Sequence, residues 1–353
     1  MRTVTIRAGH AYEVQIEEGL LKEAGARIRA VSAAKKALLV SDDNVFPLYG
    51  ETVAASLRNA GFEVSKFVFA NGEAQKNLQT YGEILKTAGE ERLSRSDLIV
   101  ALGGGVTGDM AGFAAATYQR GIGFVQIPTT LLACIDSSVG GKTAVDLPCG
   151  KNQVGAFYQP LLVLIDPKVL DTLPDIEYRN GCAEIIKTAV LDGEELFEKI
   201  RKTPIRDQYE DVIAYCVDFK RKYVEEDEFD LGLRMKLNLG HTIGHGVEAC
   251  SDYRVPHGQA VAMGLAAISR AAVKKGVLPA SDAEKILELL ECYRLPTDLP
   301  YGVEELFFAA AVDKKNAGSD MRLIVPHAIG DCVIEKIPRE EFREWLSAGN
   351  AKE

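Results

Sequence analysis

The first half of the chain alternates short apolar runs with segments of helical spacing. Residues 3–7 and 12–17 alternate apolar and polar positions, which predicts an opening β-hairpin. Further strands are expected at 36–41, 63–69, 97–102, 123–127 and 162–165, and helices between them at 54–59, 78–90 and 110–117. Repeated strand–helix units of this kind predict a parallel sheet with helices on both faces.

The second half follows helical periodicity almost throughout. Helices are expected at 177–191, 207–226, 239–249, 260–275, 283–291, 304–312 and 340–348, with a strand pair at 321–325 and 331–336. We place a boundary near residues 170–172. The pattern therefore predicts an α/β nucleotide-binding domain over 1–170 and a mostly α-helical domain over 171–353.

Composition narrows the class of protein. The 353 residues are 47% hydrophobic and 26% charged, which excludes a disordered tail or a coiled-coil rod. The formal net charge of -10 argues against nucleic acid or an anionic membrane as a partner. No stretch approaches the ~20 apolar residues of a membrane span. Seven scattered cysteines without a Cys-x-x-Cys pair indicate a reduced compartment, so we expect a cytoplasmic protein.

A glycine-rich loop follows the strand at 97–102. The run from Gly103 to Asp109 satisfies G-x-G-x-x-G, in which backbone N–H groups and a helix N-terminus can approach a pyrophosphate. No acidic residue stands ~20 positions further on, as a ribose-binding fingerprint requires. A tight strand-to-helix turn without a ligand is therefore an equal alternative. Asp42, at the end of an earlier strand, is the better candidate to bind a ribose.

Three of the five histidines fall close together. His241 and His245 are four residues apart and share a helix face, and His257 follows a turn that contains Pro256. Converging imidazoles suit a divalent metal such as zinc. Glu184, between apolar neighbours on a helix, is a candidate third ligand because a buried carboxylate needs a partner. The alternatives are two hydrogen-bonded helix histidines with one loop histidine, and a salt bridge from Glu184 to Lys187 or Lys220.

Several cations sit beside glycine or in apolar surroundings in this acidic chain. Each alone is more typical of a surface charge, but the set favours an anionic small-molecule substrate. Lys142 follows two glycines without the earlier glycine of a phosphate-binding P-loop, which disfavours that class. The set comprises Arg120, Lys142, Lys151, Lys187, Lys220, Arg234, Lys314 and Lys315.

Ordered motifs over nearly the whole chain resemble the 3-dehydroquinate synthase family of sugar-phosphate cyclases. The most specific are ALGGGVTGD (101–109), YQRG (118–121), PTTL (128–131), IDSSVGGKT (135–143), GKN (150–152), GAFYQP (155–160), AEIIK (183–187) and LNLGHTIGH (237–245). The resemblance implies an NAD-binding N-terminal domain, a helical metal-binding C-terminal domain, a cleft between them and a homodimer. It also implies a divalent metal, with zinc favoured and cobalt as the alternative.

The resemblance also implies a role for individual residues. The metal ligands are Glu184, His241 and His257, so that His245 is an acid/base group rather than a ligand. The catalytic set is His245, Lys187, Asp136, Lys142 and Lys220. The substrate contacts are Arg120, Asn152, Arg234, Asn238 and Lys314 or Lys315, with Arg120 reaching the neighbouring subunit's site. The NAD contacts are Asp42, Asn71, Gly72, Glu73, Ala74, Gln75, Lys76, Gly105, Val106, Thr107, Gly108, Asp109, Thr129, Thr130, Lys142, Lys151, Val169, Leu170, Asp171 and Thr172.

The implied reaction is redox-neutral overall. NAD oxidises the C5 alcohol of 3-deoxy-D-arabino-heptulosonate 7-phosphate, a phosphorylated sugar acid, and phosphate then leaves by β-elimination. Re-reduction and an intramolecular aldol step give 3-dehydroquinate, in the shikimate pathway to aromatic amino acids. Such an enzyme is a carbon–oxygen lyase that uses NAD and a metal.

Three rival functions stay open. Another sugar-phosphate cyclase shares the first step, although the segment from Asp136 to Lys142 favours the dehydroquinate enzyme. A metal-dependent polyol dehydrogenase would accumulate NADH. An inactive regulator would bind NAD without turnover.

Overall fold

The structure, a computed structural model, describes residues 1–313 and 320–351, which form two compact units. Unit 1 comprises Met1–Pro174 and Tyr209–Phe229. Unit 2 comprises Asp175–Gln208 and the described residues from Asp230 onward. The division at residue 170 assigned 209–229 to the second domain. Here this segment belongs to unit 1, because its helix α7 (Tyr209–Glu226) packs against strands β1 (Arg2–Ala8) and β2 (His10–Ile16).

Unit 1 is built on a seven-stranded sheet, in the order β1-β2-β9-β6-β5-β3-β4. The predicted hairpin of β1 and β2 is antiparallel, and every other pairing in this sheet is parallel. This confirms the parallel sheet that the sequence predicts. The other strands are β3 (Lys36–Asp42), β4 (Glu63–Phe69), β5 (Leu98–Gly103), β6 (Gly123–Pro128) and β9 (Leu162–Ile165).

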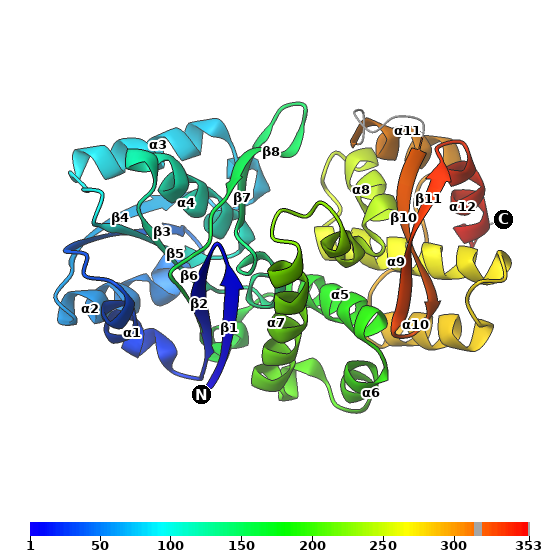
Figure 1. Cartoon of the computed structure of the whole chain (residues 1–353), viewed down its shortest axis with the longest axis horizontal. Coiled ribbons are helices and arrows are strands. Elements are labelled where there is room, and N and C mark those ends of the chain that lie inside the picture. Colours follow the sequence, from blue (N-terminus) through cyan, green and yellow to red (C-terminus); the bar gives the residue numbers. More distant parts are fainter. Residues whose placement is uncertain (314–319, 352–353) are drawn as a thin grey trace. The chain divides into compact units, whose positions relative to one another are not determined.

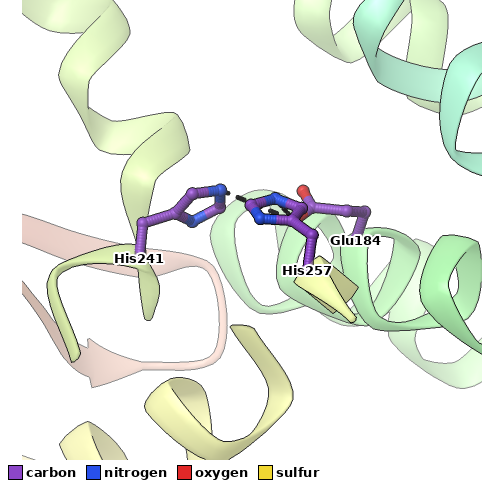
Figure 2. A group of neighbouring side chains, drawn as sticks. All are labelled: Glu184, His241 and His257. Carbon is purple, nitrogen blue, oxygen red and sulfur yellow. Dashed lines mark ion pairs between the residues drawn. The ribbon is translucent and has the colours of Figure 1, made fainter. Parts of the chain in front are cut away.

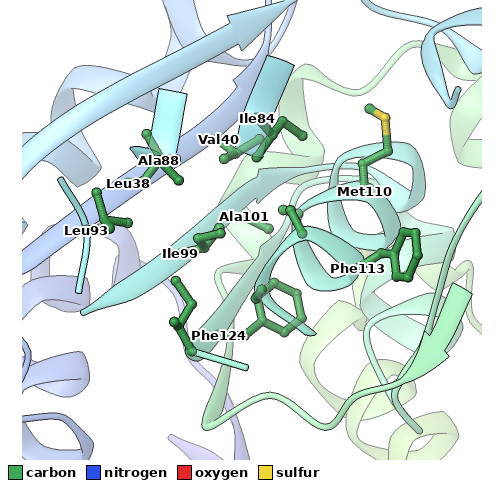
Figure 3. Packing of buried hydrophobic residues seen from close by; sticks show 14 of the residues in the cluster. Leu38, Val40, Ile84, Ala88, Leu93, Ile99, Ala101, Met110, Phe113 and Phe124 are labelled. Atoms are coloured by element: carbon green, nitrogen blue, oxygen red, sulfur yellow. The ribbon is translucent and has the colours of Figure 1, made fainter. Parts of the chain in front are cut away.

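Helices cover both faces of this sheet. Figure 1 shows α3 (Leu78–Glu90) and α4 (Gly105–Thr117) on one face and α1 (Ala24–Val31) and α2 (Glu51–Asn59) on the other. Under α3 and α4, apolar side chains of β3 and β5 form a closely packed core with Ile84, Met110 and Phe113 (Figure 3). The core fixes α4, and therefore the glycine-rich loop, over the carboxyl end of β5.

Asp97 ties the starts of two central strands together. Its Oδ1 accepts hydrogen bonds from the backbone N–H groups of Lys35 (3.2 Å) and Lys36 (2.8 Å), and its Oδ2 accepts from the N–H and hydroxyl of Ser94 (both 2.7 Å). Burial raises the pKa of this carboxyl, but the four hydrogen bonds outweigh burial and hold the pKa below its ordinary value of 3.8. The ionised carboxylate therefore stabilises the register between β3 and β5.

Replacing Asp97 with asparagine is expected to lower the free energy of unfolding by about 2–3 kcal/mol at pH 7, because an amide nitrogen would face backbone donors. The folded-state pKa lies below the unfolded value, so this stability is present above about pH 4 and is lost as the pH falls through the folded pKa. Urea unfolding at a series of pH values measures it. The exposed Asp331→Asn serves as the control, and a pH-independent difference from wild type contradicts the argument.

A two-stranded hairpin in unit 1 was not predicted. Strands β7 (Lys142–Leu147) and β8 (Gly150–Phe157) pair antiparallel, with Lys142 opposite Phe157. Glycines and charged residues interrupt the apolar alternation in this segment, so the pattern carried no strand signal. The hairpin brings Lys142, Lys151 and Asn152, three residues of the predicted site, onto one small element.

Unit 2 is mostly helical, as predicted, and α9 (His257–Lys274) lies at its centre. It packs against α5 (Asp175–Asp192), α8 (His241–Cys250), α10 (Ala280–Cys292) and α12 (Glu341–Gly349). Unit 2 also contains α6 (Glu194–Lys202), which was not predicted, α11 (Val303–Asp313), and the antiparallel pair β10 (Asp320–Ala328) and β11 (Asp331–Pro338).

Glycines allow α9 to approach its neighbours backbone to backbone. A Cβ on Gly264 would lie 2.0 Å from the carbonyl oxygen of Gly240, and a Cβ on Gly258 would lie 2.3 Å from that of Asn180. No side chain larger than hydrogen fits at either position without a shift of backbone.

The helices in the part of the chain that the structure describes include no candidate membrane span, since none combines the necessary length with the necessary hydrophobicity.

Candidate functional site

Three predicted metal ligands come together in unit 2. Glu184 lies within α5, His241 begins α8 and His257 begins α9. One ligand atom from each residue lies within 4.8 Å of the other two. The Nε2 atoms of both histidines are 3.5 Å from the same oxygen, Oε1 of Glu184 (Figure 2). Two imidazoles and a carboxylate form a donor set that suits zinc and similar divalent ions.

The surroundings of Glu184 fit a bound cation. The residue is 1% exposed, and its Oε1 faces the Nε2 atoms of His241 and His257 rather than solvent. Lys187, one turn along α5, forms an ion pair with it. Burial raises the pKa of Glu184, but Lys187 and the two histidines outweigh burial and hold it well below the ordinary value. A buried, ionised carboxylate that faces two imidazole nitrogens is a suitable partner for a metal ion.

In both His241 and His257 the second ring nitrogen, Nδ1, faces a hydrogen-bond acceptor. Nδ1 of His241 lies 3.1 Å from the carbonyl oxygen of Leu239, and Nδ1 of His257 lies 3.2 Å from Oε2 of Glu248. Burial lowers the pKa of His241 to about 3. Burial also acts to lower the pKa of His257, but the carboxylates of Glu184 and Glu248 raise it to about 10. His257 must therefore lose a proton when it binds a metal.

His245 occupies a different position from the ligand set. Its ring centroid is 5.4 Å from that of His241 and 6.1 Å from that of His257. It groups with Glu248 and His257 rather than with Glu184 and His241. The shared helix face of His241 and His245 therefore does not make both of them partners of Glu184. The sequence also left open a salt bridge from Glu184 to Lys187 or to Lys220. The ion pair of Glu184 with Lys187 is present, whereas Lys220 pairs with Asp136 in unit 1.

The glycine-rich loop of unit 1 leads from β5 into α4. Gly104 is the N-cap of α4, so no side chain caps the first backbone N–H groups of this helix. A Cβ on Gly104 would lie 3.0 Å from Thr130 Cγ2. A Cβ on Gly108 would lie 2.6 Å from Gln126 Oε1 on β6, so this glycine permits close helix–strand packing. The loop thus has the form of a phosphate cradle at a helix N-terminus.

Asp42 lies beside this loop, as the order of strands predicts. Its Oδ2 is 3.4 Å from the hydroxyl of Thr107 in the first turn of α4. Its Oδ1 accepts hydrogen bonds from the N–H groups of Asn44 (3.0 Å) and Val45 (2.9 Å). The buried hydroxyl of Thr129, which follows β6, has no hydrogen-bond partner among the described residues. These groups fit a nucleotide at the carboxyl ends of β3, β5 and β6.

A charged network joins several other predicted NAD residues of unit 1. Lys76 is 5% exposed, and its Nζ lies 2.6 Å from Oδ2 of Asp109 and donates to Oδ1 of Asn152 at 2.5 Å. Lys151 pairs with Glu73 at 3.1 Å. The network links the segment of residues 71–76 to α4 and to the β7–β8 hairpin. Sequence alone gave no reason to expect Asn152, a predicted substrate contact, beside Lys76.

Short elements hold the remaining nucleotide candidates. Asn71 donates from its backbone and side-chain nitrogens to Oδ1 of Asp43, both at 2.8 Å, and these bonds lower the pKa of Asp43. Val169 and Leu170 are buried in the short helix Pro167–Thr172. The backbone carbonyl of Val169 accepts a hydrogen bond from the hydroxyl of Tyr49 at 3.1 Å. Asp171, Thr172 and residues 71–74 are exposed.

The predicted substrate residues are divided between the units. In unit 1, Lys220 donates to the backbone carbonyl of Asp136 at 2.7 Å and to its carboxylate, and Arg120, Lys142 and Asn152 are exposed. Arg120 has a left-handed backbone, with φ of 66°. Unit 2 holds Lys187, Asn238, His245 and Arg234, which is 2% exposed. Lys314 and Lys315 lie outside the described residues.

Glu248 is the residue of this site that the sequence analysis missed. It is 2% exposed on α8. A signal existed, since Glu248 follows His245 by three positions in an apolar helix, and a buried carboxylate there needs a partner just as Glu184 does.

The fold of the two units, together with the convergence of Glu184, His241 and His257, is similar to that of sugar-phosphate cyclases of known structure. A solved 2-deoxy-scyllo-inosose synthase, complexed with carbaglucose-6-phosphate, NAD+ and Co2+, is 25% identical with a TM-score of 0.88, covering 98% of this chain and 99% of its own. A 2-epi-5-epi-valiolone synthase from Streptomyces hygroscopicus subsp. jinggangensis 5008, with NAD+ and Zn2+ bound, is 28% identical with a TM-score of 0.88 over 100% of both chains.

The sequence comparisons identify the family within this class. The family models described as 3-dehydroquinate synthase N-terminal and C-terminal match residues 66–180 and 181–316. A 3-dehydroquinate synthase from Streptococcus sanguinis (strain SK36) is 44% identical over 344 residues, covering 96% of this chain and 97% of the relative. The chain belongs to the 3-dehydroquinate synthase family.

Proposed function

We propose that this enzyme converts 3-deoxy-D-arabino-heptulosonate 7-phosphate to 3-dehydroquinate and phosphate. It is then an NAD- and metal-dependent carbon–oxygen lyase of the shikimate pathway. The observation that carries the proposal is the convergence of Glu184, His241 and His257 within 4.8 Å in a chain of this family. The cytoplasm is the proposed compartment, because the cysteines are free.

Glu184, His241 and His257 are the proposed ligands of one divalent ion. We favour zinc, because the donor set is two imidazoles and a carboxylate, and cobalt is a functional substitute. When bound, the ion supplies Lewis acidity toward a substrate hydroxyl. Lys187 keeps Glu184 ionised, and the anchored rings of His241 and His257 present Nε2 atoms toward it.

NAD is the proposed cofactor of unit 1. The cradle of residues 105–109, the segment 71–76, Thr129, Thr130 and residues 169–172 would hold it, together with Asp42, Lys142 and Lys151. When bound, NAD+ supplies a transient hydride acceptor. The backbone N–H groups at the start of α4 offer donors to a pyrophosphate, and the ion pair of Lys76 with Asp109 fixes the end of that turn.

The substrate carries a carboxylate and a phosphate, so several cations are needed to bind it. We assign this role to Arg120, Lys142, Lys187, Lys220 and Arg234, with Asn152, Asn238 and Lys314 or Lys315. Asp136 accepts from Lys220 and orients that ammonium group. His245, close to the metal ligands but outside their set, is the proposed proton-transfer group. A homodimer is proposed, in which the exposed Arg120 serves the neighbouring subunit.

The proposal predicts phosphate release without net redox change. The purified enzyme, supplied with the heptulosonate phosphate, zinc and substoichiometric NAD+, is expected to release many phosphates per NAD and to accumulate no NADH. Phosphate and absorbance at the NADH band are followed together. Enzyme treated with a chelator is the control and is expected to release none until zinc is restored.

The other outcomes separate the rival functions. Net NADH without phosphate would move the chain to the polyol dehydrogenases. Turnover of glucose 6-phosphate or sedoheptulose 7-phosphate instead of the heptulosonate would indicate another cyclase. Binding of NAD with no turnover of any of these substrates would indicate a regulator.

A further inference from the structure

Glu248 is a buried carboxylate beside the proposed metal centre. It lies on α8, is 2% exposed, and places Oε2 3.2 Å from Nδ1 of His257 at the start of α9. The opposite nitrogen of the same ring, Nε2, is 3.5 Å from Oε1 of Glu184. The imidazole of His257 therefore lies between two buried carboxylates, one on each side.

The other ligand histidine has an equivalent anchor. Nδ1 of His241 is 3.1 Å from the carbonyl oxygen of Leu239, while its Nε2 is 3.5 Å from Oε1 of Glu184. In both rings, Nδ1 meets a hydrogen-bond acceptor and Nε2 turns toward the metal group. An acceptor at Nδ1 fixes the tautomer in which Nε2 carries the free lone pair. His257 differs because its acceptor is a charged side chain rather than a backbone carbonyl.

The turn between α8 and α9 holds Glu248 and His257 in register. The carbonyl oxygen of Glu248 accepts from the N–H of Tyr253 and from the hydroxyl of Ser251, both at 2.8 Å. The hydroxyl of Ser251 accepts in turn from the N–H of Val255 at 3.1 Å. Asp252 and Tyr253 take left-handed backbone angles in this turn, with φ of 52° and 58°. The chain is thus tied to the backbone of Glu248 just before it reaches His257.

We propose that Glu248 is a positioning residue that holds the ring of His257 with Nε2 aimed at the metal. This inference rests on the proposed metal centre and extends it by one residue. A carboxylate that accepts from Nδ1–H also makes the imidazole a stronger electron donor. Loss of Glu248 would free the ring to rotate and to adopt the other tautomer, which weakens the metal site without removing a ligand.

A second metal ion is the competing explanation for the same geometry. His245, Glu248 and His257 also place ligand atoms within 4.8 Å of one another. The two explanations exclude each other at Nδ1 of His257. A nitrogen that donates its proton to Glu248 has no free lone pair with which to coordinate an ion. The number of ions bound per chain distinguishes them.

The test is a titration of the metal-free full-length enzyme with Co2+, followed by its visible absorption. Glu248→Ala is expected to weaken Co2+ binding by about 10–100-fold and to alter the absorption spectrum. Glu248→Gln keeps an acceptor of the same size without the charge, so its affinity is expected to fall between wild type and Glu248→Ala. The exposed Glu284→Ala is the matched control and is expected to bind like wild type. Thermal unfolding of each metal-free variant identifies any that fails to fold, and Glu248→Gln then carries the test.

Each result has a distinct meaning. Wild-type affinity and spectrum in both Glu248 variants would overturn the positioning role. Two Co2+ ions per wild-type chain, with only the second lost in Glu248→Ala, would overturn it in favour of a second site. Glu184→Gln, titrated in parallel, tests the metal centre itself. Unchanged affinity in that variant would overturn the metal centre and the inference together, whereas loss there with no effect at Glu248 overturns the inference alone.

Discussion

Replacing Glu184 with glutamine is expected to abolish tight metal binding and to slow phosphate release by on the order of 10³-fold. The metal ion contributes several kcal/mol of transition-state stabilisation, and each 1.36 kcal/mol corresponds to about tenfold in rate. Glutamine has nearly the volume of glutamate and keeps an oxygen beside Lys187, so the buried ammonium retains an acceptor. The loss therefore reports the missing negative charge at the point where both Nε2 atoms converge, 3.5 Å from Oε1.

Metal content after dialysis and the rate of phosphate release measure this effect. Glu177→Gln, on the same helix but outside the ligand group, is the control and is expected to keep both its metal and its activity. A Glu184→Gln enzyme that retains stoichiometric metal and full turnover would contradict the assignment of this carboxylate as a ligand.

Replacing Gly258 with alanine is expected to lower both stability and metal affinity, although Gly258, which follows His257 in the chain, supplies no ligand atom itself. The new Cβ would lie 2.3 Å from the carbonyl oxygen of Asn180 and 2.5 Å from its Cα, which are backbone atoms of α5. The contact can be relieved only if α9 moves away from α5. Overpacking of this kind costs about 1–3 kcal/mol. The same movement would separate His257 from Glu184, which lies one turn beyond Asn180, and metal affinity is expected to fall by about tenfold or more.

Thermal unfolding of the metal-free enzyme and a Co2+ titration measure the two effects separately. Gly82→Ala is the matched control, because Gly82 lies within α3 and a Cβ there meets nothing within 4 Å. That control is expected to gain up to about 1 kcal/mol from the helix preference of alanine. A Gly258→Ala enzyme that behaves like the control would show that the helices can separate without disturbing the site.

Some elements were predictable residue by residue because local pattern and tertiary environment agree. The predicted bounds of β4, α3 and β9 match the structure, and α9 differs by a few residues at its start. In α3 the buried residues Thr80, Ile84 and Ala88 have the helical period, and β9 is a short apolar run that is buried throughout, as a central strand of a parallel sheet is. Burial and local preference therefore select the same conformation. In the β7–β8 hairpin, local pattern and tertiary environment do not agree. Glycines and charged residues interrupt the apolar alternation of both strands, and only the pairing between them shows that they are strands.

The placement of α7 was beyond the reach of the sequence pattern. Its helical periodicity was recognised, but periodicity reports that a face is buried and not which element covers it. The chain leaves unit 1 at Pro174 and returns to it at Tyr209, so that α7 packs beside β1. A single cut near residue 170 cannot describe a unit that is built from two segments of the chain.

Short-range periodicity and the cost of burying charge were enough to predict the alternating α/β half, the helical half, the glycine-rich loop and the residue types of the proposed metal group. Which groups meet was settled by tertiary packing. It brought Glu184, His241 and His257 together from three helices, set His245 apart from them, and placed Glu248 behind His257. Glycines at 258 and 264 let α9 approach α5 and α8, and close packing fixes such distances between helices through contacts far apart in the chain.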